Sequence, residues 1–276
     1  MVANVTGATL PQVITGNTIY ASAPGLVWNT PTATTLSGIG SNDTTFPAVA
    51  DLDGDGNPEI VLVDAYTHKL SIFNPAGALL TDLLLISGAF QCGGPPMIGR
   101  IGSLPGPQIG VATCAEYAVY AYTPGSLSPL WHQHTADASG QTTSTLFKDN
   151  LGQARIYYGD QSTIWVFNAK TGQVLQQIPT TSGTAIEGPV IAGFDAGPAT
   201  SSISPGRLIV TASNYNLNGG QAGIRIFSGV PIGPARAVWN DHSYHQTNVT
   251  DNVGHMPAVE TNSWVAPVNS YRVQHQ

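Results

Sequence analysis

The stretch FPAVADLDGDGNPEIVLVD, from Phe46 to Asp64, places four carboxylates within nine residues between two apolar runs. Short apolar runs bounded by turn residues are typical of β-strands. Only 9% of the residues in the chain are charged, whereas roughly 25% is usual for globular proteins. So dense a group of carboxylates in such a chain therefore indicates a specific role for the turn.

The acidic turn has the composition of a calcium-binding loop. Ca²⁺ takes six to eight oxygen ligands, and Gly54 and Gly56 permit the positive φ angles that a tight curl requires. A solvated acidic hairpin is the alternative, but its carboxylates would repel one another without a cation. An EF-hand is excluded, because its twelfth position is the apolar Leu62 and a strand follows. We expect Ca²⁺ to be held by carboxylates of Asp51, Asp53, Asp55 and Glu59 and by the backbone carbonyl of Asn57.

The pattern around this turn recurs along the chain. Four units each contain a first apolar run, a turn, and further runs, at a period of roughly 45–50 residues. The second runs are EIVLVD, QIGVAT, RIYYGD and RLIVTA, and the third runs are KLSIFN, AVYAYT, TIWVFN and GIRIFS. A fourth run follows in each unit, and no stretch shows helical periodicity. The sequence therefore predicts an all-β fold.

Four antiparallel strands repeated at this period describe the blade of a β-propeller. We expect one domain over residues 1–276, a propeller of about five four-stranded blades. The predicted blades cover residues 47–94, 95–142, 143–187 and 188–245, and a composite blade combines 1–46 with 255–276. There, HMPAVE (255–260) supplies the first strand and closes the ring, which leaves no free sheet edge. A fragment of a longer propeller and a separate C-terminal tail are the alternatives.

The two cysteines, Cys92 and Cys114, are predicted to form a disulfide. An even number of cysteines in a Ser/Thr-rich, Lys-poor chain favours an exported protein. In the repeat, one cysteine precedes the first strand of a blade and the other ends its second strand. Antiparallel pairing would bring their Cα atoms within the bridging limit of about 7 Å. Two buried free thiols are the alternative.

Composition argues against two classes of partner. The net charge is −7 and the chain has only 9 Lys and Arg residues without a basic cluster, so binding to nucleic-acid phosphates is not expected. No apolar run approaches the roughly 18 residues of a membrane span.

The stretch PAVADLDGDGNPEIVLVD resembles the FG-GAP repeat, also called the VCBS or integrin-α-like repeat, of extracellular β-propellers. The resemblance implies a calcium loop between the first two strands of a blade and a secreted or cell-surface location. The equivalent turns in the other units retain only Asp149 and Asp195, which implies that those blades carry no metal. The segment from VWNDHSYH onward is similar to the tail after such propellers in large bacterial surface proteins, which implies neighbouring domains of a larger protein.

Two classes of function remain open. The resemblance implies adhesion, carbohydrate binding or extracellular scaffolding, with a glycan or an extracellular protein surface as partner. The alternative is a polysaccharide-active enzyme, a lyase or a glycoside hydrolase, built on a propeller. Glycoside hydrolysis needs two carboxyl groups roughly 5–10 Å apart. The candidates are Asp51, Glu116, Glu187, Asp195 and Glu260, and no spacing selects a pair, so no catalytic residue is assigned.

Aromatic and histidine residues near the fourth apolar run of the last unit are candidate ligand contacts, because exposed rings stack on sugars. The candidates are Trp239, His242, Tyr244 and His245. The motif WHQH, with His132 and His134, and the pair in WNDHSYH are also considered as zinc ligands. However, Trp131 and Trp239 occupy equivalent positions in the repeat, which favours a packing role for the tryptophans with polar residues merely following them.

Overall fold

The fold was analysed in a computed structural model. The residues that it describes are 1–7, 11–21, 32–36, 45–85, 92–184, 186–193, 203–213, 222–237, 239, 247, 262, 264–265 and 268–273. This part of the chain contains twenty β-strands and no α-helix, which confirms the all-β class. Within it, no helix has the length and hydropathy that crossing a membrane would require.

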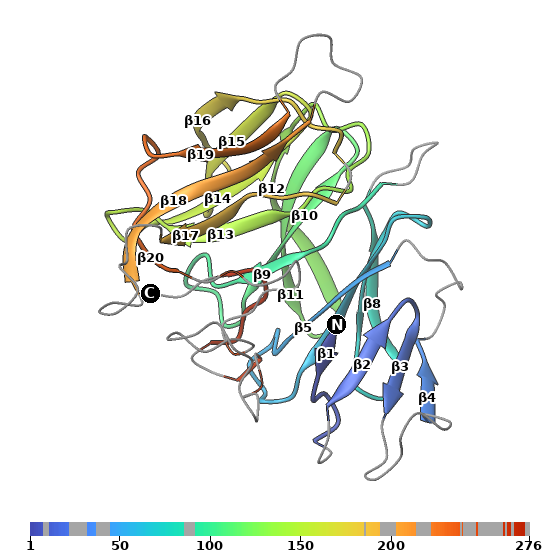
Figure 1. Cartoon of the computed structure of the whole chain (residues 1–276). Coiled ribbons are helices and arrows are strands. Elements are labelled where there is room, and N and C mark those ends of the chain that lie inside the picture. Colours follow the sequence, from blue (N-terminus) through green and yellow to red (C-terminus); the bar gives the residue numbers. More distant parts are fainter. Residues whose placement is uncertain are drawn as a thin grey trace.

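The strands form five antiparallel sheets that follow one another in chain order (Figure 1). The first sheet contains β1 (Val2–Ala3), β2 (Gln12–Thr15), β3 (Thr18–Ala21) and β4 (Thr32–Thr35). The second contains β5 (Thr45–Ala50), β6 (Glu59–Asp64), β7 (Lys69–Phe73) and β8 (Leu79–Leu84). The third contains β9 (Met97–Gly99), β10 (Gln108–Thr113), β11 (Glu116–Thr123) and β12 (Ser126–His134).

The last two sheets continue the series. The fourth contains β13 (Ser144–Lys148), β14 (Ala154–Gly159), β15 (Thr163–Asn168) and β16 (Val174–Pro179). The fifth contains β17 (Val190–Gly193), β18 (Ile203–Ala212), β19 (Gly223–Phe227) and β20 (Pro234–Arg236). In the first four sheets each strand pairs only with its neighbours in sequence, so each is a meander built from local hairpins.

Burial falls from the first strands of a sheet to its last. All six residues of β6 are buried, whereas β8 alternates between exposed and partly buried residues. The central residues of β6, Ile60 to Val63, are continuously apolar because both faces of the strand are covered, which is the pattern of a strand in the interior of a layered fold.

Successive sheets stack face to face, and a hydrophobic cluster fills each of the four gaps between them. The alternation of side chains along β6 shows how one strand serves two gaps. Ile60 and Leu62 pack toward the first sheet, while Val61 and Val63 pack toward the third. The core is therefore a series of layers between sheets, and each of the three middle sheets packs against two neighbours.

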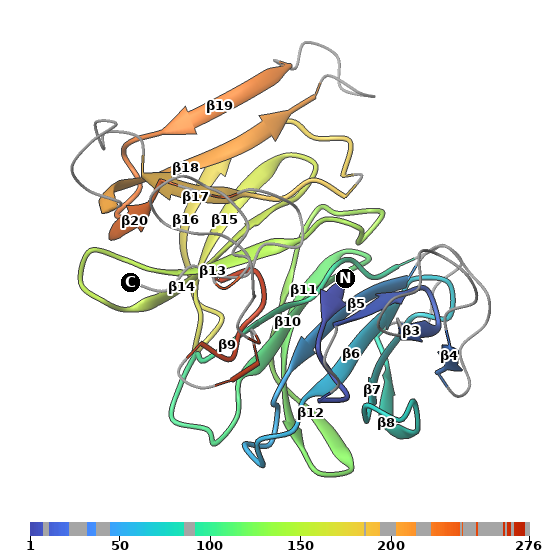
Figure 2. The ribbon, with the colours of Figure 1, turned by 60° about the horizontal axis from the view of Figure 1, so that its bottom comes forward.

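The sheets are arranged in an arc around the C-terminal segment. Figures 1 and 2 both show the first and fifth sheets at opposite ends of this arc. Tyr271 forms an antiparallel bridge with Ile98 of β9, and Val273 forms a parallel bridge with Leu146 of β13. The C-terminal residues 268–273 thus lie along inner strands of the third and fourth sheets.

The predicted closure by a C-terminal strand differs from the structure. The position beside β2 is taken by β1, with Val2 opposite Val13, and residues 255–261 lie outside the described residues. A local hairpin closes a much shorter loop than a strand from the other end of the chain, which costs less chain entropy. The fourth strand of this sheet is Thr32–Thr35.

The fifth sheet also departs from the repeat, in the position of its last strand. The repeat predicts the fourth run of the last unit, ARAVWN (235–240), as the outermost strand beside β19. Instead, β20 pairs with the first residues of β18, from Ile203 to Pro205. This is possible because β18 is ten residues long and extends past the end of β17, so that its beginning offers an unpaired edge.

Candidate metal centre

The acidic loop connects β5 to β6 in the second sheet. The two strands pair up to Ala50 and Glu59, so the intervening residues must reverse direction within a tight turn. Gly54 and Gly56 have φ angles of 82° and 88°, in the left-handed region that favours glycine. The predicted curl of the backbone is therefore present.

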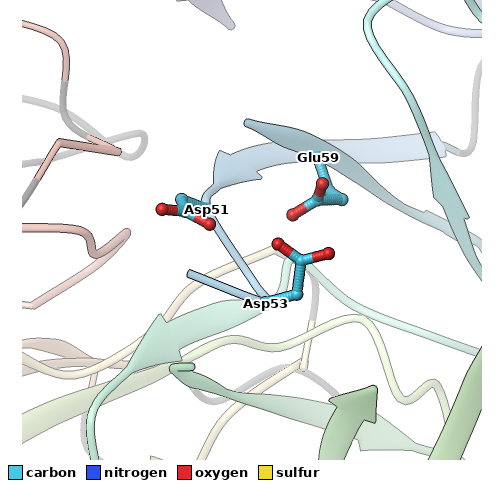
Figure 3. Close-up of side chains that lie close together, drawn as sticks. All are labelled: Asp51, Asp53 and Glu59. Carbon is cyan, nitrogen blue, oxygen red and sulfur yellow. The ribbon is translucent and has the colours of Figure 1, made fainter. Parts of the chain in front are cut away.

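The turn brings three of the five predicted ligands together. Carboxylate oxygens of Asp51, Asp53 and Glu59 lie within 4.8 Å of one another, and Figure 3 shows the three side chains converging. Asp51 is 9% exposed and Glu59 is 5% exposed. Three partly buried carboxylates at this separation repel one another unless a cation or protons neutralise them.

Backbone hydrogen bonds orient all three carboxylates, and Asp53 accepts from the Asp55 N–H at 3.1 Å. Asp51 accepts from the N–H of Gly54 at 2.7 Å and of Gly56 at 3.1 Å. Glu59 accepts from the N–H of Leu52 at 2.7 Å. Each carboxylate retains lone pairs beyond those used by these donors, so the set can also coordinate a hard cation through oxygen.

The electrostatics of the loop show most clearly at Glu59. Burial, reinforced by the charges of the three neighbouring aspartates, raises the pKa of Glu59 from 4.5 to about 7, although the Leu52 hydrogen bond opposes the shift. A carboxyl group with a raised pKa in the folded state binds its proton more tightly there than in the unfolded chain. In the metal-free loop, the contribution of Glu59 to stability therefore falls as the pH rises from about 4.5 to about 7.

The other two predicted ligands are paired with each other. Asp55 accepts hydrogen bonds from the backbone N–H of Asn57 at 2.7 Å and from its side-chain amide at 3.2 Å. Both residues are exposed. Asp51, Asp53 and Glu59 are therefore the centre of the candidate site, and Asp55 stands at its rim.

A residue that sequence reasoning missed holds the loop from outside. The side chain of Asn269 accepts from Asp51 N–H at 2.9 Å and donates to the Asp51 carbonyl at 2.7 Å. Asn269 is 4% exposed. It lies 218 residues away in the chain, and no local motif marks it. Gly106 packs directly against the backbone of the acidic loop, because a Cβ at this position would overlap the Leu52 carbonyl oxygen.

Replacing Asn269 by alanine tests this support. The change leaves the buried N–H and C=O of Asp51 without partners, and each such group costs about 1–3 kcal/mol. We expect Asn269→Ala to destabilise the protein by about 2 kcal/mol in urea unfolding and to weaken calcium binding. Asn74→Ala is the matched control, since Asn74 makes only a turn contact to Ala78 in the same sheet. Equal effects of the two changes would contradict a role for Asn269 at the loop.

The equivalent turn of the fourth sheet is stabilised without the acidic motif. Asp149 accepts from the N–H groups of Leu151 and Gln153, both at 2.8 Å, and pairs with Arg155 at 2.7 Å. Its carboxylate thus serves as a turn cap. Asp195 lies outside the described residues.

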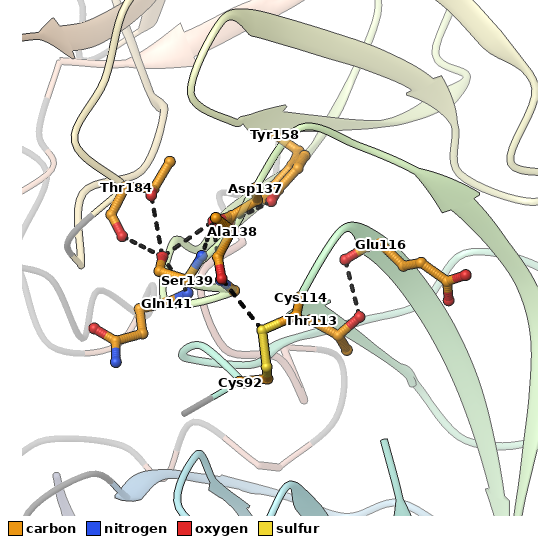
Figure 4. Close-up of a disulfide and its surroundings, with 11 residues drawn as sticks. Cys92, Thr113, Cys114, Glu116, Asp137, Ala138, Ser139, Gln141, Tyr158 and Thr184 are labelled. Carbon is orange, nitrogen blue, oxygen red and sulfur yellow. Dashed lines mark hydrogen bonds between the residues drawn. A yellow bond between two sulfur atoms is a disulfide. The ribbon is translucent and has the colours of Figure 1, made fainter. Parts of the chain in front are cut away.

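The predicted disulfide is present between Cys92 and Cys114, with a Cα–Cα distance of 5.2 Å. Figure 4 shows the bond joining the segment before β9 to the turn between β10 and β11. Gly94 N–H also donates to the Ala112 carbonyl at 3.2 Å. The bridge therefore extends the pairing with β10 to the residues that precede β9.

Removing the bridge is expected to cost about 3 kcal/mol, because it closes a loop with a sequence separation of 22 and so restricts the unfolded chain. The double variant Cys92→Ser/Cys114→Ser avoids a remaining free thiol. Its urea midpoint should fall while binding of calcium stays unchanged. Two titratable thiols in the unfolded wild-type protein, or an unchanged midpoint, would contradict the bridge.

A buried aspartate beside the disulfide organises the connection from the third to the fourth sheet (Figure 4). Asp137 is 0% exposed. Its Oδ1 accepts from the N–H of Ser139 at 3.0 Å and of Gly140 at 2.9 Å. Its Oδ2 accepts from the hydroxyls of Thr142 at 2.9 Å and Tyr158 at 2.6 Å. Burial and the adjacent Asp137 carboxylate raise the pKa of Tyr158 well above its usual value.

The tryptophans follow the packing role that the repeat indicated. Trp131 is 8% exposed, and its ring N–H donates to the Ala169 carbonyl of the fourth sheet at 2.8 Å. Trp239 is partly buried, with the Arg272 guanidinium over its ring at 5.4 Å from the centroid. His242, Tyr244 and His245, predicted with Trp239 as ligand contacts, lie outside the described residues.

The candidate catalytic carboxylates occupy different elements. Asp51 belongs to the acidic loop, and Glu116 begins β11 of the third sheet. Glu187 lies between the fourth and fifth sheets, where it accepts from the Thr184 N–H at 2.9 Å and from the Ser182 hydroxyl. Glu260 lies outside the described residues.

Comparison with known proteins yields similarity at the level of the fold. No protein-family model and no curated protein matches the chain. The crystal structure of the Vibrio cholerae biofilm matrix protein Bap1 is similar, with a TM-score of 0.62 and 12% identity over 99% of this chain and 76% of that one. A Bacteroides caccae protein of unknown function covers 99% of this chain and 96% of its own, at a TM-score of 0.41 and 14% identity.

Proposed function

We propose that the five sheets are blades of a β-propeller and that the acidic loop is a calcium site of the FG-GAP type. The propeller is supported by the meander order of the sheets, the burial of their first strands and the apolar layer between each consecutive pair. Calcium is supported by the convergence of Asp51, Asp53 and Glu59 on glycine-shaped backbone, because hard oxygen donors suit this ion.

We further propose that the protein is secreted or exposed at a cell surface, where it acts in adhesion, carbohydrate binding or matrix scaffolding. The observation that carries this proposal is the similarity in fold, over 99% of the chain, to a protein named for the biofilm matrix. The disulfide is consistent with it, since such bonds persist in oxidising compartments. Calcium would be available there to hold the acidic loop in its folded geometry.

The partner is proposed to be a glycan or an extracellular protein surface. A surface poor in Lys and Arg, with a net charge of −7, is suited to neutral polar ligands rather than to polyanions. Polar surfaces of this kind recognise sugars through hydrogen bonds together with a few aromatic contacts.

An array of polysaccharides and oligosaccharides, probed with the calcium-loaded protein, tests the proposal. Saturable binding to a defined glycan, without release of soluble oligosaccharides from it, is the expected result. Cleavage of the bound polysaccharide would favour an enzyme instead. If no glycan is retained and no extracellular matrix protein is bound either, the proposed role is wrong.

A further inference from the structure

A second cluster of metal-ligating side chains lies on the outer part of the third sheet. His132 and His134 are alternate residues at the end of β12, so their side chains leave the same face of the strand. Glu116, the first residue of β11, is directly opposite His134 in the register, and Ala118 is opposite His132. Cross-strand pairing therefore adds a carboxylate to a His-x-His pair.

Each imidazole lies beside a different oxygen of the Glu116 carboxylate. Nδ1 of His132 lies 3.4 Å from one Glu116 oxygen, and Nδ1 of His134 lies 3.4 Å from the other. Ligand atoms about 2.1 Å from a tetrahedral ion are separated by about 3.4 Å, so rotamer changes must bring one nitrogen of each histidine and one shared Glu116 oxygen to that separation. The two imidazole centroids are 6.2 Å apart, so both rings flank the same carboxylate.

The ligands can reach an ion from solvent, and the backbone beneath them is fixed. The side chains of His132, His134 and Glu116 are 62%, 85% and 25% exposed, so they can adjust their rotamers without disturbing the core. Hydrogen bonds from Ala115 N–H to the Asp137 carbonyl at 2.7 Å and from Thr135 N–H to the Ala115 carbonyl at 2.9 Å hold the strand ends together.

We propose that Glu116, His132 and His134 bind a Zn²⁺ ion on the surface of the third sheet. Two imidazoles and one carboxylate form a ligand set for zinc, and three protein ligands leave the fourth tetrahedral position open. Imidazole nitrogen suits transition metals, whereas Ca²⁺ prefers oxygen alone. This site is therefore chemically separate from the acidic loop between β5 and β6.

Calorimetric titration with zinc tests the site. The protein is first saturated with calcium, so that the acidic loop does not compete for the added metal. One zinc per chain is expected in the wild type, with affinity reduced at least about 100-fold in His132→Ala/His134→Ala and about 10-fold in Glu116→Gln. Gln133→Ala is the matched control, because Gln133 lies between the two histidines on the opposite face of β12.

The chain has seven histidines. The outcomes of the titration distinguish the proposed site from binding at any of the other histidines. Zinc binding that survives intact in the double histidine variant would overturn the proposal, because the metal would then sit elsewhere. Equal weakening in Gln133→Ala would overturn it as well. Melting temperatures measured in a chelator should be the same for all variants, and imidazole NMR signals of His132 and His134 should shift upon addition of zinc.

Discussion

Adding calcium to the metal-free protein is expected to raise its melting temperature by about 8–16 °C. A ligand present at about a thousandfold over its dissociation constant stabilises the folded state by about 4 kcal/mol. For domains of this size, each kcal/mol shifts the melting temperature by about 2–4 °C. The gain arises because the ion neutralises Asp51, Asp53 and Glu59, whose oxygens lie within 4.8 Å of one another. Scanning calorimetry with calcium and with chelator measures it.

The effect of Glu59→Gln on stability should differ in sign between the metal-free and the calcium-loaded protein. Glu59→Gln removes a buried carboxyl group whose pKa is raised to about 7. The metal-free variant should therefore be slightly more stable than the wild type. The same variant should lose most of the calcium gain. Asp55→Asn should retain more of that gain, because Asp55 is paired with Asn57 outside the converging trio.

A charge control separates local coordination from general electrostatics. Asp82→Asn removes an exposed carboxylate that pairs with Lys69 on the same sheet, and it should leave the calcium response unchanged. A melting temperature that does not depend on calcium in the wild-type protein would contradict the metal site. A response that Asp82→Asn weakens as much as Glu59→Gln does would contradict the assigned ligands.

Replacing Asp137 by alanine is expected to destabilise the protein by about 4 kcal/mol. The change deprives two buried hydroxyls and two backbone N–H groups of their acceptor, and each buried donor left unpaired costs about 1–3 kcal/mol. Some relaxation of the 137–142 connection reduces the sum. Urea unfolding monitored by fluorescence measures the change.

A double-mutant cycle identifies the source of that loss. Tyr158→Phe removes the hydroxyl that donates to Asp137 at 2.6 Å, so it should cost less in the Asp137→Ala background than in the wild type. Asp82→Ala, at an exposed ion pair, should change stability by less than about 1 kcal/mol. Strict additivity of the Asp137 and Tyr158 changes would show that their hydrogen bond does not account for the loss.

Much of the local structure could be predicted from the sequence. The alternation of carboxylates with Leu52 and Gly54 located the acidic turn, and the positive φ angles of Gly54 and Gly56 follow the expected curl. The second and third apolar runs all lie in strands, and the two cysteines are bonded. These features depend on short-range pattern and on hairpins between neighbouring strands, which local sequence encodes.

Long-range contacts could not be predicted in the same way. Asn269 holds Asp51 across 218 residues, and β20 pairs with the start of β18 instead of lying beside β19. The position beside β2, which was expected for HMPAVE, is taken by β1, and HMPAVE itself lies outside the described residues. A turn motif or an apolar run shows that a segment can pair, but not which free edge it will find.

The sequence by itself determined that the chain forms short strands, that they join as local hairpins, and that one turn concentrates negative charge. The tertiary structure decided which edges meet, which carboxylates converge and which distant side chains support them. The physical reason is the separation in sequence between the residues that interact. Backbone conformation and side-chain alternation follow from neighbouring residues, whereas the meeting of Asp51 with Asn269 depends on how complete sheets and segments pack in space.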